Sequence, residues 1–118
     1  TTGDRKQAEE QYQKALAIAQ KLVELDPTNA QWQMDLLKSH GKFGLFYRGE
    51  GQEAKALEEF MLCVPIFERI LARFPDHYEW RVIANDVYSD IATSYKNLND
   101  EVNAEAYRNK ARKIAPNP

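Results

Sequence analysis

The sequence repeats itself at an offset of 48 residues, and this period restricts the possible folds more than any other feature. Trp32 and Trp80 are one such pair. Further residues match at the same offset: Ala8, Ala56 and Ala104; Gly3, Gly51 and Asn99; Ala15, Cys63 and Ala111; Pro27 and Pro75; Tyr47 and Tyr95. A period of about 20 to 50 residues indicates units that cannot bury their own apolar faces and therefore stack into a solenoid. Because solenoids mostly bind other molecules, the period also bears on function.

The composition fits one helical domain and gives no sign of nucleic acid or membrane binding. The chain has 118 residues, 29% of them charged, with only 5 Gly and 5 Pro. Its net charge of −2 gives no general attraction to phosphate, and no apolar run approaches the ~20 residues of a membrane span. We therefore expect a single domain over residues 1–118 whose partners are neither nucleic acids nor membranes.

Few residues could support catalysis or metal binding. Cys63 is the only cysteine, which excludes an internal disulfide and favours a reducing compartment such as the cytoplasm. Together with only His40 and His77 it cannot build a zinc site. Neither histidine has an acid or a nucleophile at a fixed spacing. We therefore expect a non-enzyme with no metal, no cofactor and no catalytic residues.

Apolar residues recur at helical spacing along the whole chain, and no stretch alternates as a strand would. Thr28 with Gln31 forms a potential capping box, and Asp76 with Glu79 repeats it 48 residues later. The pattern predicts five helices in antiparallel succession, at about 4–25, 29–48, 52–74, 77–97 and 100–115.

Pro65 is the one residue that conflicts with this pattern, because it lies inside the third predicted helix. A proline there removes a backbone hydrogen bond and presses on the carbonyl of Met61, at a cost of about 3 kcal/mol. The apolar stripe continues through Ile66, Phe67 and Ile70. We therefore predict a kinked helix, with a break at Pro65 as the alternative.

Two segments together carry a resemblance to a known repeat family. The segment from Phe43-Gly44 through Tyr47 and Gly51 to Ala56 follows the order of residues in tetratricopeptide repeats, and the segment from Tyr88 to Pro116 does so again. Compared with that family's unit of about 34 residues, each helix here is longer by about one heptad. Such an insertion keeps the apolar face in register.

Residues 26–36, which run from Asp26-Pro27 through Asn29 and Trp32 to Asp35-Leu36, are similar to extended bacterial tetratricopeptide repeats with a DPxNxxWxxDL signature. The resemblance covers essentially the whole chain. It implies an all-α, antiparallel helix-pair solenoid with a right-handed superhelical twist. It also implies a scaffold that occurs beside signalling, peptidase-like or NTPase domains in multidomain proteins.

In such arrays the first helix of each pair lines the concave face. The positions on those helices that the core does not use follow a spacing of three, four and three residues, which places each set on one face. These eight positions are the predicted partner-binding surface: Lys38, Gly41, Leu45 and Arg48 in one unit, and Asp86, Ser89, Thr93 and Lys96 in the next.

The predicted function is therefore a non-catalytic protein-interaction module that binds a peptide or protein segment on its concave face. The alternative is an arm for self-association, or for intramolecular regulation of a larger signalling or NTPase-type protein. The first helix is the second half of a unit, and the chain begins without Met. We accordingly expect a fragment of a longer protein with further repeats upstream, and a possible homodimer through the open first helix.

Overall fold

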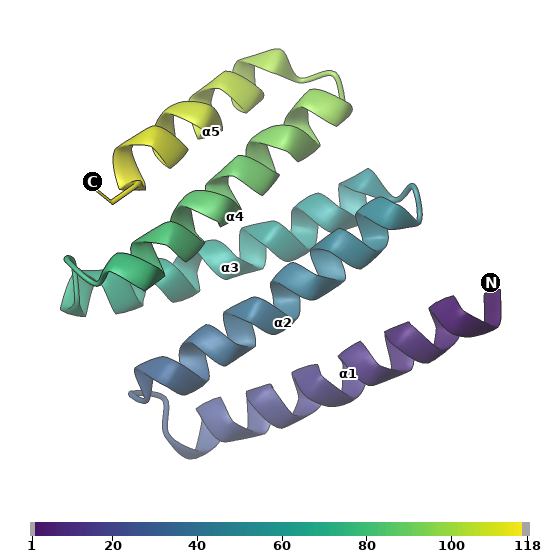
Figure 1. The fold of residues 1–118 in the computed structure, drawn as a ribbon, viewed down its shortest axis with the longest axis horizontal. Helices are drawn as coiled ribbons and strands as arrows, with labels where there is room; N and C mark the ends of the chain where they lie inside the picture. The colour runs from purple at the N-terminus through teal and green to yellow at the C-terminus, as the bar shows by residue number, and fades with distance from the viewer. Residues whose placement is uncertain (1, 117–118) are drawn as a thin grey trace.

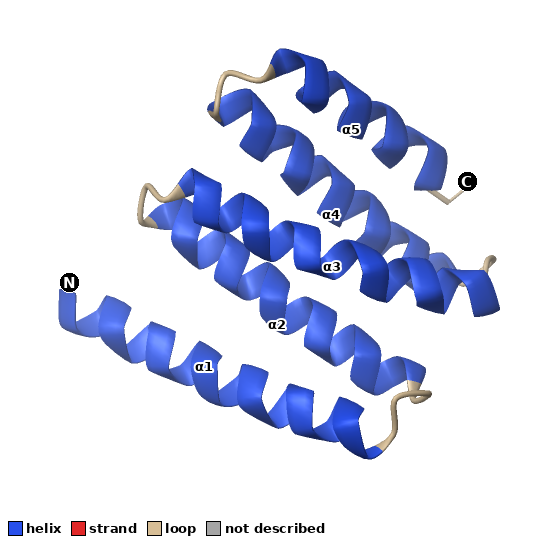
Figure 2. Cartoon of the chain, turned by 180° about the vertical axis from the view of Figure 1, so that it is seen from behind, coloured by secondary structure: helices blue, strands red, loops and turns tan. Residues whose placement is uncertain are grey.

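The described part of the chain, residues 2–116 of a computed structural model, is all-helical and contains no strand (Figures 1 and 2). The five helices are α1 (Thr2–Leu25), α2 (Ala30–Gly49), α3 (Glu53–Arg73), α4 (Tyr78–Asn97) and α5 (Glu101–Ile114). Each bound lies within two residues of the predicted one, so the all-α prediction is confirmed.

Neighbouring helices pack in pairs. The two most extensive pairings are α2 with α3 and α4 with α5, while α1 packs on α2 and α3 packs on α4. Figure 1 shows α3 behind α2 and α4, and the reverse view in Figure 2 shows it in front of them. The molecule measures 42 × 40 × 22 Å, with α1 and α5 at opposite ends of the row.

The 48-residue period is visible in how the paired helices begin. Asn29 caps α2, where its side-chain oxygen accepts a hydrogen bond from the Trp32 amide at 3.0 Å. His77 caps α4 in the same way, through Nδ1 and the Trp80 amide at 3.2 Å. The predicted capping boxes are therefore wrong by one residue. Thr28 cannot cap α2 because it lies one residue before the cap, where its hydroxyl donates to Asp26 at 2.7 Å.

The period recurs in the turns that follow α2 and α4. Gly51 and Asn99 are equivalent residues, and both have a left-handed backbone, with φ of 74° and 63°. Glycine and asparagine are the residues that adopt this conformation most readily. In both turns the next residue donates its amide to a tyrosine carbonyl of the preceding helix: Gln52 to Tyr47 at 2.8 Å and Asp100 to Tyr95 at 2.8 Å.

α3 supplies most of the core and runs through Pro65 without interruption, so the alternative of a break is wrong. Its buried side chains recur at helical spacing: Ala56, Phe60, Cys63, Ile66, Phe67, Ile70 and Leu71. They form one cluster with Met34 and Leu37 of α2 and with Ala84, Val87 and Ile91 of α4. α3 therefore joins the two helix pairs into one body.

α1 is the least covered of the helices. Ala19 is its only buried residue, whereas Ile18 is 61% exposed and Leu25 is 78% exposed. Tyr12 makes edge contacts with the rings of Phe43 and Phe46, which hold α1 against α2. None of the helices described is both long and apolar enough to cross a membrane.

Candidate functional site

The eight predicted partner-binding residues belong to α2 and α4 in equal numbers, and we call their surface the α2/α4 face. Six of them are exposed: Lys38, Leu45, Asp86, Ser89, Thr93 and Lys96. Gly41 and Arg48 are half-buried. Two of the exposed residues, a lysine and a leucine, are therefore on α2, and the other four, which are polar or charged, are on α4.

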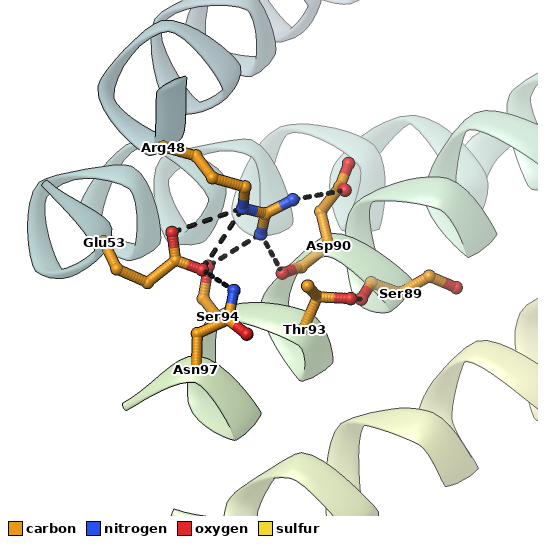
Figure 3. Close-up of polar contacts among 7 residues, drawn as sticks. All are labelled: Arg48, Glu53, Ser89, Asp90, Thr93, Ser94 and Asn97. Atoms are coloured by element: carbon orange, nitrogen blue, oxygen red, sulfur yellow. Dashed lines mark hydrogen bonds and ion pairs between the residues drawn. The ribbon is translucent and has the colours of Figure 1, made fainter. Parts of the chain in front are cut away.

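Arg48 differs from the other seven because its guanidinium is hydrogen-bonded to other residues of the same chain (Figure 3). Its Nε lies 3.2 Å from both carboxylate oxygens of Glu53. Nη1 donates to Asp90 Oδ1 at 3.3 Å, while Nη2 donates to the Asp90 carbonyl at 2.9 Å and to Ser94 Oγ at 3.0 Å. The side-chain amide of Asn97 donates to Glu53 Oε1 at 2.7 Å and completes this hydrogen-bond network. Arg48 thus ties the end of α2 to α3 and to the middle of α4.

The surroundings of this group are only partly open to water. Ser94 is fully buried, and the Arg48 guanidinium lies 5.0 Å from the centre of the Phe60 ring. Burial raises the pKa of the Asp90 carboxyl above its ordinary value, while the charge and hydrogen bond of Arg48 lower it. The network therefore fixes the end of α2 relative to α4. A contact between Arg48 and a partner stays a prediction. The donors of Arg48 already bond to Glu53, Asp90 and Ser94.

Two glycines of α2 have opposite surroundings. A Cβ at Gly44 would lie 2.4 Å from Cε1 of Phe60, so the close approach of α2 and α3 requires a glycine there. At Gly41, by contrast, a Cβ would meet no neighbouring atom of the described chain within 4 Å. Glycine inside a helix costs about 1 kcal/mol relative to alanine. Packing explains Gly44 and does not explain Gly41.

Leu45 lies one helical turn after Gly41 and is 54% exposed. With no side chain at position 41, bare backbone adjoins this apolar side chain on the α2/α4 face. On α4 the Thr93 hydroxyl donates to the Ser89 carbonyl at 3.0 Å, which holds that side chain along its own helix. The α2 half of the face thus offers apolar contact, and the α4 half offers polar groups.

One acid–base pair was missed by the sequence reasoning. His40 Nδ1 lies 3.1 Å from Glu59 Oε2 between α2 and α3, and both side chains are largely covered. The two residues are 19 positions apart, so the pair becomes visible only when the antiparallel register of α2 and α3 is known. It forms a polar link inside the first helix pair.

Cys63 is fully buried, with Sγ 3.4 Å from the Leu37 carbonyl. Burial and the nearby charges of Glu59 and Asp90 raise the pKa of its thiol to about 12. Within residues 2–116 no three His, Cys, Asp or Glu side chains are grouped so that they could hold a metal ion.

Two arginines of α5 are paired with acids of the same helix. Arg108 bonds to Glu101 and to Glu105, the latter at 2.9 Å, and Arg112 lies 3.3 Å from Glu105. The hydrogen bonds from Arg108 and Arg112 lower the pKa of Glu105.

Comparison with known protein families finds none that matches the chain, and comparison with curated proteins finds no match either.

Proposed function

We propose that the chain is a non-catalytic protein-interaction module that binds a peptide or protein segment on the α2/α4 face. The observation that carries this proposal is Gly41, since its glycine costs helix stability and has no packing reason within the fold. A partner backbone or side chain that approaches α2 closely beside Leu45 would account for it. The Arg48 network supports the same proposal because it holds both halves of the face in a fixed relation before any partner arrives.

We also propose that the helix pairs are extended tetratricopeptide-type units of a solenoid. The support is the shared 48-residue period of the caps, the left-handed turn residues and the pairing of α2 with α3 and of α4 with α5. In an array of this kind α2 and α4 would line the concave side, and the proposed face would then lie there.

The test is capture of a partner from the cells that make the protein. The variant Leu45→Glu with Lys96→Glu removes the apolar contact and reverses one charge on the face. Its matched control is Val102→Glu with Lys113→Glu, which changes the net charge equally at exposed positions of α5. We expect a protein that is captured by the wild type and by the control, and lost with the face variant. Capture that both variants leave unchanged removes the proposal. Substitution of Arg48 is unsuitable here because it would also break the network.

A second candidate function is self-association through α1. It is favoured by the exposure of Ile18 and Leu25 on that helix. Measurement of the molecular mass in solution over a range of concentrations separates the two, since only the second candidate predicts a dimer.

A further inference from the structure

The side of α3 that faces away from the core carries an apolar surface. An open hollow of about 630 Å³ lies there, and it is lined by Ala54, Leu57, Glu58, Met61 and Leu62 of α3 and by Tyr95 of α4. Leu62 is 50% exposed. Glu58 is the single charged group among these six residues. The hollow therefore suits an occupant with an apolar body and a cationic tip.

The corresponding residues of the neighbouring units are polar. An offset of 48 converts Leu57, Met61 and Leu62 into Glu9, Gln13 and Lys14 of α1. The same offset in the other direction gives Glu105, Asn109 and Lys110 of α5. The repeat therefore needs no apolar residue at these positions, and α3 differs from both of its equivalents.

This surface is not exposed by the lack of a neighbouring helix. α3 is the middle helix of the five, with α1 and α2 before it and α4 and α5 after it. It packs on both α2 and α4, and Figure 2 shows it in front of them. Further units of an array would pack beyond α1 or α5, so they would leave this side of α3 uncovered.

Six exposed residues of α3 form one stripe with a symmetric spacing. Intervals of three, four, three, four and three residues keep them on one side of the helix. We call these six the α3 stripe: Lys55, Glu58, Leu62, Pro65, Arg69 and Ala72. Leu62 and Pro65 are at its centre. Glu58 and Arg69 flank them, and neither forms a hydrogen bond or an ion pair with another residue of the described chain, 2–116.

We propose that two copies of the chain associate through the α3 stripe, with their α3 helices antiparallel about a two-fold axis. A centre between residues 63 and 64 sets Leu62 of each copy against Pro65 of the other. The same register sets Glu58 against Arg69, and the symmetry makes this pair twice. The aliphatic part of Arg69 then fills the hollow of the other copy, while its guanidinium reaches Glu58.

Pro65 supports the proposal because nothing within one copy explains a proline there. A proline inside a helix costs about 3 kcal/mol. Pro65 is exposed, so its ring is not needed to fill the core. In the proposed dimer the ring supplies apolar surface at the centre of the contact, where Leu62 of the second copy covers it.

Comparison with α1 shows that the two charges are not sufficient for such a contact. At the four central positions of the stripe α1 has Glu10, Lys14, Ala17 and Lys21. The outer two carry the same charges as in α3, but a lysine replaces the central leucine. Symmetric pairing through these positions would bury that lysine, which is unfavourable without a partner of opposite charge. α1 therefore offers matched control positions.

The proposed dimer is weak, and it is independent of the α2/α4 face, with which the α3 stripe shares no residue. One helix from each copy gives a contact smaller than the roughly 800 Å² per partner of a standard interface. We therefore expect a reversible equilibrium between monomer and dimer, with Kd on the order of 10–100 µM.

Sedimentation equilibrium of the full chain measures this association. Leu62→Glu should raise Kd at least about tenfold, because it places a charge at the apolar centre of the contact. A wild-type chain that is still monomeric at about 1 mM, far above the expected Kd, overturns the inference.

Exchange of the two flanking charges tests the register. Glu58→Arg sets two arginines against each other and Arg69→Glu sets two glutamates, so each variant alone should dimerise at least about tenfold more weakly. An equimolar mixture of the two should associate again, because every pair then joins an arginine to a glutamate. Such a recovery also shows that both variants are folded. Glu10→Arg, the matched change on α1, should leave Kd unchanged. If the mixture does not associate, the inference is wrong.

The remaining outcomes identify a different occupant. Pairing through α1 also gives a dimer, so the variants rather than the mass separate the two. A dimer that Ile18→Glu abolishes and Leu62→Glu leaves intact contradicts the inference. So does a monomeric chain whose capture of a partner is lost with Leu62→Glu, since the stripe would then bind another protein. The dimer should persist in the variant Leu45→Glu with Lys96→Glu, so that loss of capture there tests the α2/α4 face separately.

Discussion

The ring of Phe60 fills the space that a side chain at Gly44 would need, since a Cβ there would lie 2.4 Å from Cε1. Phe60 is 1% exposed and belongs to the cluster that joins the two helix pairs. The contact therefore sets how closely α2 and α3 approach. Gly41, three residues earlier on the same helix, has open space at the corresponding point.

The two glycines should respond to alanine with opposite signs. Gly44→Ala should lower the free energy of unfolding by about 1–3 kcal/mol, because the methyl group overpacks the ring of Phe60. Gly41→Ala should raise it by about 0.5–1 kcal/mol, because alanine is the better helix former and meets no obstacle. Urea denaturation of both variants measures the difference. Equal effects would show that α2 and α3 are not packed as described.

Loss of Arg48 should destabilise the chain in a pH-dependent way. Burial raises the pKa of Asp90 and Arg48 counteracts this rise, so Arg48→Met should raise that pKa further. At pH 7 the unpaired carboxylate should lower the free energy of unfolding by about 2 kcal/mol. Because a carboxyl with a raised folded pKa regains stability when it is protonated, the deficit should shrink as the pH falls towards about 4.

The control for this experiment is Lys96→Met, because Lys96 is the residue equivalent to Arg48 in the second unit and is exposed. We expect it to change stability by less than about 0.5 kcal/mol at either pH. A deficit of the Arg48 variant that stays constant with pH would contradict the role of Asp90.

Cys63 should be inert in the folded chain. Its thiol is fully buried and its pKa is raised to about 12, so very little thiolate exists at pH 8. A thiol reagent such as DTNB should therefore react at the rate of unfolding, and at once in denaturant. Rapid reaction of the native chain would show that α3 is not covered by α2.

The helix caps give a test of the local structure. Asn29→Ala should cost about 1 kcal/mol, because the Trp32 amide loses its side-chain acceptor. Thr28→Ala removes only an exposed hydroxyl contact with Asp26 and should cost less than half of that. Thermal unfolding of the two variants measures the order, and a larger cost for Thr28→Ala would favour the capping box predicted from the sequence.

The helices could be predicted from the sequence because their signals are local. The apolar spacing and the 48-residue period gave the five helices, and the continuing stripe after Pro65 correctly favoured an unbroken helix. The caps were misplaced because Thr28 and Asn29 are both good capping residues. Which of them caps depends on the bond from Thr28 to Asp26.

The site was less predictable because its contacts join distant segments. Arg48 and Asp90 are 42 residues apart, and helical spacing on α2 alone could not show that the arginine reaches across to α4. The repeat did contain part of the answer. Lys42 and Asp90 are equivalent positions of opposite charge, so the first unit has no counterpart of the acid that pairs with Arg48.

The most direct test of the interaction function is photo-crosslinking from the α2/α4 face in the cells that make the protein. A photoreactive phenylalanine is placed at Leu45, or at Val102 of α5, which is more exposed at 83%. We predict a discrete adduct with one partner from position 45, and none from position 102. Absence of an adduct at position 45, or the same products from both positions, would contradict the account.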